Sequence, residues 1–189
     1  MNKAFEFALK HYGLEEIKGR KHEPIIIEAF KTVGHGWIKD DETAWCAAWM
    51  GYCLHKAGLE FLKTVRARDY EKYGKETKMP KIGDIAVFWR YKESSGYGHV
   101  GFYVSEDEHD IYVLGGNQSN EVRISKYPKS QLLGYREILK ASVTDTFELQ
   151  NIKKEQNEFL ERLGILRKDK YTLDNEIAAL IQEFTFKNK

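Results

Sequence analysis

Proline, cysteine and long hydrophobic runs are all scarce in this sequence. Only three prolines and two cysteines occur among 189 residues. Cys46 and Cys53 lie on one predicted helix, about 10 Å apart by helical rise, which is too far for a disulfide. No stretch approaches the length of an uncharged membrane span, and charge interrupts the first ten residues, where a signal peptide would be apolar. We therefore expect reduced thiols, no membrane span and a chain that is cytoplasmic when synthesised.

Positive and negative charges are also nearly balanced. Lysine and arginine number 30 against 29 aspartates and glutamates, which gives a net charge of +1. This balance provides no field to hold a polyanion, so nucleic acid is not an expected partner. Hydrophobic residues make up 42% of the chain, which indicates a globular protein with a sizeable core. The length leaves room for one ordinary domain and an appendage.

Helices are predicted first along the chain, and strands follow them. The helices are expected over residues 2–12, from near His22 to Gly34, and from Thr43 as N-cap to Gly58. Short β-branched and aromatic runs bounded by turn residues predict strands at 82–89, 99–104, 111–114 and 121–124. Tight connections imply an antiparallel sheet. The predicted fold class is therefore α+β, with the helix that bears Cys46 laid against the sheet.

The composition changes beyond Ala141. Apolar residues recur between positions 149 and 184 at alternating spacings of three and four, interrupted only by Gln156 and Lys170. We expect one domain over residues 1–140 and a heptad helix or helical hairpin over residues 145–187. The heptad pattern favours a partner helix, in a second copy or in another protein. The alternative is a hairpin that packs on itself or on the domain.

Cys46 and His99 are the candidate catalytic pair. Cys46 lies at a predicted helix start, where unpaired N–H groups and the helix dipole stabilise a thiolate and lower the thiol pKa. Its own N–H is a natural oxyanion donor. His99 begins a predicted strand and could take the thiol proton. Asn117 follows the next strand and could hold the imidazole in the productive tautomer, with Gln118 as the second choice.

Each of these residues also has a structural interpretation. A lone helical cysteine is often a small core residue, and we assign Cys53 to the core. A histidine at a strand start can simply cap an edge. The residues Gly115 and Gly116 before Asn117 are also an ordinary turn signal.

Candidate substrate contacts and metal ligands come from the same segments. The side chains suited to grip a polar ligand are Trp37, Trp45, Tyr97 and Gln118. Cys46, Cys53 and His55 lack a zinc spacing, and the acidic run 40–42 lacks the alternating oxygen ligands of a calcium loop. We read that run as charge complementing a helix start, and we expect no metal.

Four ordered blocks resemble the NlpC-like and CHAP-like papain-fold cell-wall hydrolases, and most closely a phage-associated subgroup. The blocks are Trp45-Cys46-Ala47-Ala48, Gly83-Asp84-Ile85-Ala86-Val87-Phe88, Gly98-His99-Val100-Gly101 and Gly115-Gly116-Asn117-Gln118-Ser119. The resemblance spans roughly residues 14–138. It implies a papain-like fold, no cofactor and hydrolysis of amide bonds in peptidoglycan.

The resemblance also assigns roles by position. It makes Cys46 the nucleophile, His99 the base and Asn117 the third polar residue. Two departures accompany it: many relatives carry an acidic residue or a second histidine in the third role, and the heptad segment is not part of the family module.

The predicted function is a peptidoglycan amidase or endopeptidase that acts through a thioester on Cys46. We expect a phage or prophage endolysin that reaches the cell wall after release or delivery. Alternatives are a secreted antibacterial amidase effector and a non-catalytic papain-fold protein that assembles through its heptads. Acyl transfer or deamidation of a protein substrate would use the same thiolate chemistry.

Overall fold

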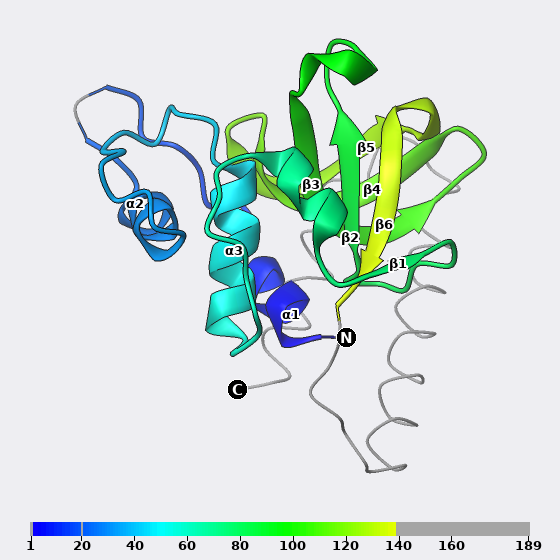
Figure 1. The fold of residues 1–189 in the computed structure, drawn as a ribbon. Helices are drawn as coiled ribbons and strands as arrows, with labels where there is room; N and C mark the ends of the chain where they lie inside the picture. Colours follow the sequence, from blue (N-terminus) through cyan, green and yellow to red (C-terminus); the bar gives the residue numbers. More distant parts are fainter. Residues whose placement is uncertain (1, 20, 139–189) are drawn as a thin grey trace. The chain divides into compact units, whose positions relative to one another are not determined.

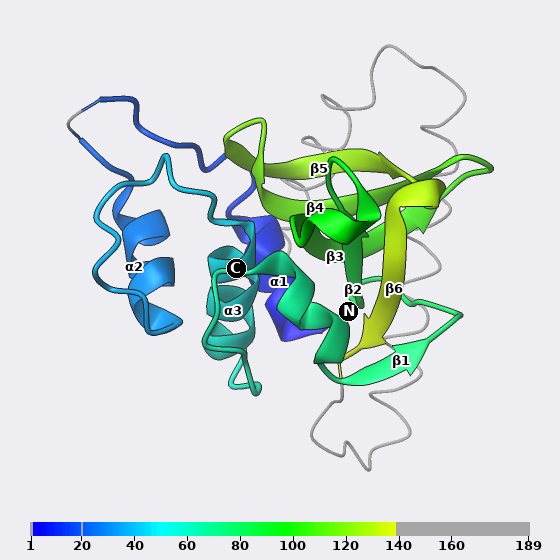
Figure 2. The same cartoon turned by 45° about the horizontal axis from the view of Figure 1, so that its top comes forward.

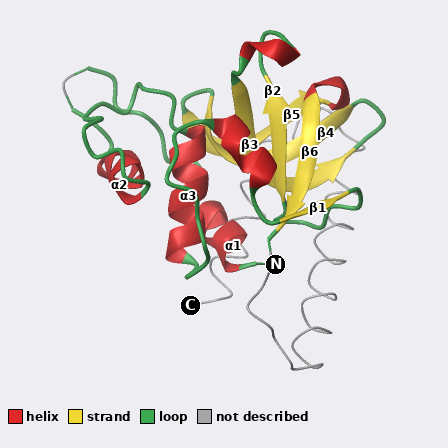
Figure 3. Cartoon of the chain, viewed as in Figure 1, coloured by secondary structure: helices red, strands yellow, loops and turns green. Residues whose placement is uncertain are grey.

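The computed structural model describes residues 2–19 and 21–138, in which helices precede an antiparallel sheet (Figure 1). The α-helices are α1 (Lys3–Lys10), α2 (Pro24–Thr32) and α3 (Cys46–Lys56). The short 3-10 helices are η1 (Ala67–Lys72), η2 (Glu93–Ser95) and η3 (Lys129–Gln131). The strands are β1 (Lys75–Thr77), β2 (Ile85–Trp89), β3 (Gly98–Glu106), β4 (Asp110–Gln118), β5 (Glu121–Pro128) and β6 (Leu132–Glu137). The predicted α+β class is confirmed, and Figure 3 shows helices and strands in separate regions.

The sheet has the strand order β1-β6-β2-β3-β4-β5, and all its paired strands are antiparallel. The four predicted strands correspond to β2 to β5, whereas β1 and β6 were not predicted. The predicted heptad segment 145–187, with its candidate partner surface at 149–184, lies outside the described residues. None of the helices in the described part is both long and apolar enough to cross a bilayer.

Helix α3 lies between α2 and the sheet, and α1 packs beside it (Figures 1 and 2). It contacts α1 and α2, and it also contacts β3 and β4. Every residue from Cys46 to Leu54 is buried. A helix that is buried on all sides needs no polar face, which explains the nearly uncharged run in this part of the sequence. The burial fixes α3 as the element around which the domain is built.

The start of α3 differs from the prediction. Trp45, not Thr43, is the N-cap, and it makes no side-chain capping bond. The Thr43 N–H and hydroxyl both donate to Oδ1 of Asp40, each at 2.8 Å, so Thr43 closes a turn ahead of the helix. Cys46 is consequently the first helical residue, and no side chain occupies the N–H groups of the first turn.

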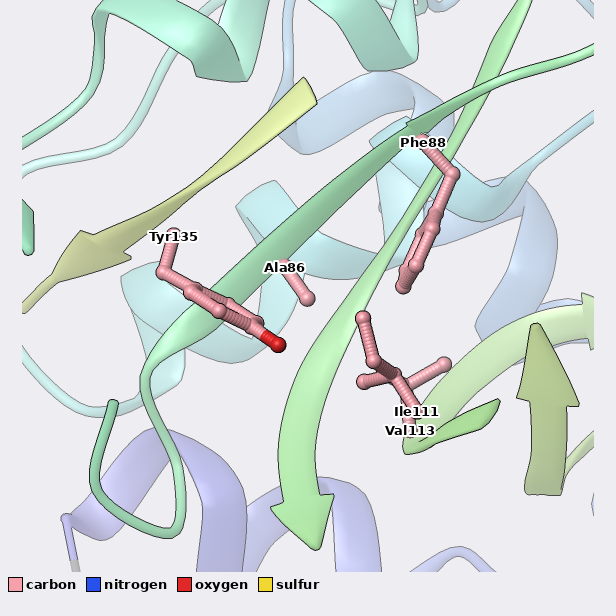
Figure 4. Close-up of a cluster of buried hydrophobic side chains, with 5 residues drawn as sticks. All are labelled: Ala86, Phe88, Ile111, Val113 and Tyr135. Atoms are coloured by element: carbon pink, nitrogen blue, oxygen red, sulfur yellow. The ribbon is translucent and has the colours of Figure 1, made fainter. Parts of the chain in front are cut away.

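A second hydrophobic cluster lies on the strands themselves. Its members come from β2, β4 and β6, and Figure 4 shows them gathered together: Ala86, Phe88, Ile111, Val113 and Tyr135. The partly buried Tyr103, Tyr127 and Leu132 pack against this cluster. The sheet is thus anchored by this cluster as well as by its contacts with α3.

The start of α3 packs closely against the sheet at Gly116 of β4. A Cβ atom at this position would lie 2.2 Å from Cζ3 of Trp45 and 2.7 Å from Cγ of Trp49. Both rings are buried and pack edge to face, with centroids 6.1 Å apart. Because neither indole can move aside, the backbone of β4 can lie against α3 only where the residue is glycine.

We expect Gly116→Ala to lower the free energy of unfolding by about 1 to 3 kcal/mol, the usual cost of overpacking a core. Gly134→Ala is the matched control, because a Cβ atom at Gly134 of β6 meets no atom within 4 Å. Chemical denaturation of both variants measures the difference. Equal stability of the two variants would contradict the assigned contact.

Candidate active site

The Cys46 thiol lies where the start of α3 meets the start of β3. Cys46 is 7% exposed, and the backbone N–H of Val100 in β3 forms a hydrogen bond that favours its thiolate form. Val100 directly follows His99, which is 2% exposed. The structure therefore places the Cys46 thiol beside the backbone of the residue that follows His99, although the two predicted residues are about fifty positions apart in the sequence.

His99 is held by Gln118. Its Nε2 lies 3.0 Å from Oε1 of Gln118, and both side chains are buried. The Gln118 amide nitrogen donates to two backbone carbonyls, that of Val113 at 3.2 Å and that of Arg123. Two acceptors around the NH₂ group fix the orientation of the amide, so Oε1 must accept from a protonated Nε2 of His99. The lone pair is then on Nδ1, where the imidazole can act as a base.

A β-bulge explains why Gln118 takes this position and not Asn117. The register of β4 against β5 shifts between Gly115 and Gln118, and Asn117 has a left-handed φ of 57°. Side chains alternate between the two faces of a strand, so an irregularity of one residue reassigns which side chain points inward. No hydrogen bond joins Asn117 to His99 within the described part of the chain, and Asn117 is only half-buried. The orienting role predicted for Asn117 is therefore proposed for Gln118.

Gly115 makes room for the hydrogen bond between His99 and Gln118. A Cβ atom at Gly115 would lie 3.2 Å from Nε2 of His99 and 3.3 Å from Oε1 of Gln118. Gly115 and Gly116 are therefore not the turn that their sequence also suggested. They are strand residues against which the active-site side chains and α3 pack closely.

Tyr127 of β5 covers one face of the imidazole. Its ring stacks on His99, with centroids 4.7 Å apart and planes inclined by 11°, and on Phe88 at 4.8 Å and 24°. The three rings form a stack that fixes the plane of the imidazole and excludes water from it. The sequence analysis missed this function of Tyr127, because the only sign of it is the strand pairing that brings β5 near β3.

Burial keeps both catalytic candidates neutral. It lowers the pKa of His99 to about 4, with the Gln118 hydrogen bond acting in the opposite direction and the Arg90 charge in the same one. Burial also raises the pKa of the Cys46 thiol, although the N–H groups of Val100 and Ala47 and the charge of Arg90 oppose it. The lowered thiol pKa predicted from the helix start is therefore wrong for this structure, because desolvation outweighs the helix N–H groups.

The first N–H groups of α3 are candidate donors for a developing oxyanion. Cys46 is the first residue of α3, and the first intrahelical bond runs from the Trp49 N–H to the Trp45 carbonyl at 2.8 Å. The N–H groups of Cys46 and Ala47 precede that bond and have no intrahelical acceptor. They lie beside Sγ, where the oxygen of an attacked carbonyl would be found.

The predicted substrate contacts have different environments. Trp45 is fully buried against Gly116, and its Nε1 donates to Glu16 at 2.7 Å, so it is a packing residue that no substrate can reach. Gln118 is buried on His99 and is likewise unavailable to substrate. Trp37 is 69% exposed beside His35 in the segment between α2 and α3. Tyr97 is 65% exposed and immediately precedes β3.

The loop before Cys46 is held by Asp41, whose role the sequence analysis missed. The buried Asp41 carboxylate accepts hydrogen bonds from the N–H groups of Ile17 at 2.9 Å and Glu23 at 2.7 Å, and from Nδ1 of His22 at 2.9 Å. Burial alone would raise the Asp41 pKa, but these hydrogen bonds together lower it. Asp41 is thus an anchor for the N-terminal segment and not a charge complementing the helix start.

Two other sequence expectations concern Cys53 and metal binding. Cys53 is fully buried in α3, and burial raises its pKa well above the ordinary value. Within residues 2–19 and 21–138, the structure contains no group of three His, Cys, Asp or Glu side chains arranged to hold a metal ion.

The segment that contains the candidate site matches a known protein family. Residues 38–117 match the family described as CHAP domain. This match confirms the resemblance to CHAP-like hydrolases over the segment that contains Cys46 and His99, and it ends one residue before Gln118. No curated protein gives a significant match.

One solved structure is a crystal structure described as similar to a lipoprotein of the NLP/P60 family, from Staphylococcus aureus subsp. aureus Mu50. It has 18% sequence identity and a TM-score of 0.43 to this chain. The match covers 73% of this chain and 41% of that chain, so it spans less than half of the length of the S. aureus protein chain.

The depressed pKa of His99 predicts how stability depends on pH. The folded protein keeps His99 neutral down to a pH of about 4, whereas the unfolded chain takes up this proton near 6.5. The unfolded state binds more protons between these values, so the free energy of unfolding falls as the pH is lowered through this window. The decrease in the free energy of unfolding that His99 causes reaches about 3 kcal/mol once the pH is below both pKa values. Denaturation curves of the wild type and His99→Gln measure it, and parallel pH dependences would contradict it.

The ring stack predicts the effect of Tyr127 on the same imidazole. Tyr127→Ala opens one face of His99 to water, so we expect the His99 pKa to rise from about 4 towards 6.5. Tyr127→Phe keeps the ring and should leave the pKa near its wild-type value. An NMR titration of the imidazole measures both variants. A low His99 pKa in Tyr127→Ala would show that the stack does not control solvent access.

Proposed function

We propose that this chain is a cysteine peptidoglycan hydrolase with a papain-like Cys46–His99–Gln118 site. The observation that carries the proposal is the Gln118 amide, which holds His99 with its Nδ1 lone pair free next to the segment that contacts Cys46. Three buried polar side chains in this order are the arrangement that thiol-dependent amide hydrolysis requires. The CHAP family match supports peptidoglycan as the substrate.

The chemistry starts from a neutral pair. His99 Nδ1 removes the proton of the Cys46 thiol as Sγ attacks the carbonyl carbon of the scissile amide. The N–H groups of Cys46 and Ala47 stabilise the resulting oxyanion. His99 then protonates the leaving amine, and the C–N bond breaks to give a thioester on Cys46. Water, deprotonated by His99, hydrolyses that thioester and restores the thiol.

Because both side chains are buried, Cys46 and His99 become charged together. An isolated thiolate would be costly in this environment, because desolvation disfavours charge on both Cys46 and His99. A thiolate forms only when the imidazolium beside it is formed as well. The Gln118 amide oxygen stabilises that imidazolium through the hydrogen bond to Nε2.

The test is the release of soluble fragments from purified cell-wall sacculi. We expect the wild type to release muropeptides and Cys46→Ala to lose this activity by several orders of magnitude, because the variant lacks the thiol that attacks the amide. Cys53→Ala is the matched control, since it removes the other thiol of the same helix. Mass spectrometry of the fragments distinguishes an amidase from an endopeptidase.

Retained turnover in a folded Cys46→Ala protein would overturn the thioester mechanism. A wild type that releases no fragments would favour the non-catalytic interaction protein instead. Circular dichroism spectra of all variants establish that they are folded.

We further propose a phage or prophage endolysin that acts on the wall after release or delivery. The CHAP match supports a wall substrate but leaves the biological setting open between this and an antibacterial effector. Genome context separates them: a neighbouring holin gene supports the lysin, and a neighbouring immunity gene supports the effector.

A further inference from the structure

Arg90, at the end of β2, is a cation without a carboxylate partner. Of the four other arginines in the described ranges, Arg68, Arg123 and Arg136 each lie within 4 Å of a glutamate, and Arg66 has no ion pair there. No ion pair involves Arg90 within the described ranges 2–19 and 21–138, and its side chain is exposed. An arginine that the fold leaves unpaired retains its full capacity to bind an anion through two parallel N–H groups.

Strand pairing brings Arg90 close to the catalytic residues. Trp89 pairs with Gly98, and the Arg90 N–H donates to the Tyr97 carbonyl at 3.0 Å, two residues before His99. The positive charge of Arg90 acts on the thiol of Cys46, the imidazole of His99 and the phenol of Tyr127, and it lowers the pKa of each. The guanidinium is therefore close enough for its charge to act on the buried pair.

Hydrogen bonds within the loop that follows Arg90 fix the Arg90 backbone. The Arg90 carbonyl accepts from the Lys92 N–H at 2.8 Å and from Oγ of Ser95 at 2.7 Å. Tyr91 has a left-handed φ of 64°, a conformation that costs a bulky residue roughly 1 kcal/mol and that persists only where the surroundings impose it.

An exposed aromatic ring lies beside the guanidinium, and a second exposed ring packs on the first. The Cζ atom of Arg90 lies 5.7 Å from the Tyr91 ring centroid, and Tyr91 packs edge to face on Tyr97 at 5.6 Å. Tyr91 is 78% exposed and Tyr97 is 65% exposed. Exposed tyrosines beside an unpaired arginine are typical of surfaces that bind a polar, anionic ligand.

We propose that Arg90 is a specificity-determining residue that binds a substrate carboxylate, with Tyr91 and Tyr97 on either side of the bound group. The preferred substrate is then a stem peptide that carries a free carboxylate next to the scissile amide, and the form with a carboxamide at that position is a poor substrate. This inference rests on the proposed hydrolase function and specifies which peptides that function selects.

The experiment compares kcat/KM on pairs of synthetic muropeptides in which one stem carboxylate at a time is converted to a carboxamide. For one such pair we expect the wild type to prefer the carboxylate by about tenfold, the effect of one charge-assisted contact. Arg90→Gln should bring the ratio close to one by slowing the carboxylate substrate, and Arg90→Lys should restore part of the preference. Lys75→Gln is the control and should leave the ratio unchanged, since Lys75 is an exposed cation on β1, at the edge of the sheet and separated from β2 by β6.

Two results overturn the inference in distinguishable ways. An active wild type that shows no preference in any pair, or an Arg90→Gln variant that keeps the preference, rejects the role of Arg90 and leaves the hydrolase intact. A wild type that cleaves neither sacculi nor any muropeptide rejects the proposed function and this inference with it.

Discussion

The contact between α3 and β4 at Gly116 is the constraint on which the site depends. The rings of Trp45 and Trp49 lie directly against the strand backbone at this point. That contact fixes how close the start of α3 comes to β3, and so where Cys46 lies relative to His99. A catalytic site of this kind is therefore positioned by core packing and not by flexible loops.

The sequence predicted the order of the elements well, because each depends on a local signal. Pro24 begins α2, and the alternating apolar runs correspond to β2 to β5. The strands β1 and β6 escaped prediction because they are short or depend on pairing with distant residues: Lys75–Thr77 is exposed, and it becomes a strand only by pairing with β6. Cys46 and His99 were identifiable from their neighbours, since a helix start and a strand start are both visible in sequence.

The third residue of the site could not be predicted in the same way. Asn117 and Gln118 are adjacent, and which of them faces His99 depends on a bulge whose presence is set by the pairing of β4 with β5. The ionisation state of Cys46 and His99 could not be predicted from the sequence either. The helix start argued for a thiolate, but the magnitude of desolvation depends on how completely Tyr127 and α3 cover the pair, and that is a property of the folded protein. The prediction of Trp45 as a substrate contact was wrong for the same reason, because its burial is also a property of the folded protein.

The carbonyl groups around Gln118 have a consequence for how this site can evolve. The carbonyls of Val113 and Arg123 both require a hydrogen donor, and the amide of Gln118 supplies it. A glutamate at this position would set its carboxylate against those two oxygens, with no donor to satisfy them. An acidic residue is therefore a poor single replacement for Gln118 in this chain. A change from Gln118 to glutamate would also require the backbones of β4 and β5 to move, so that the two carbonyls find other donors.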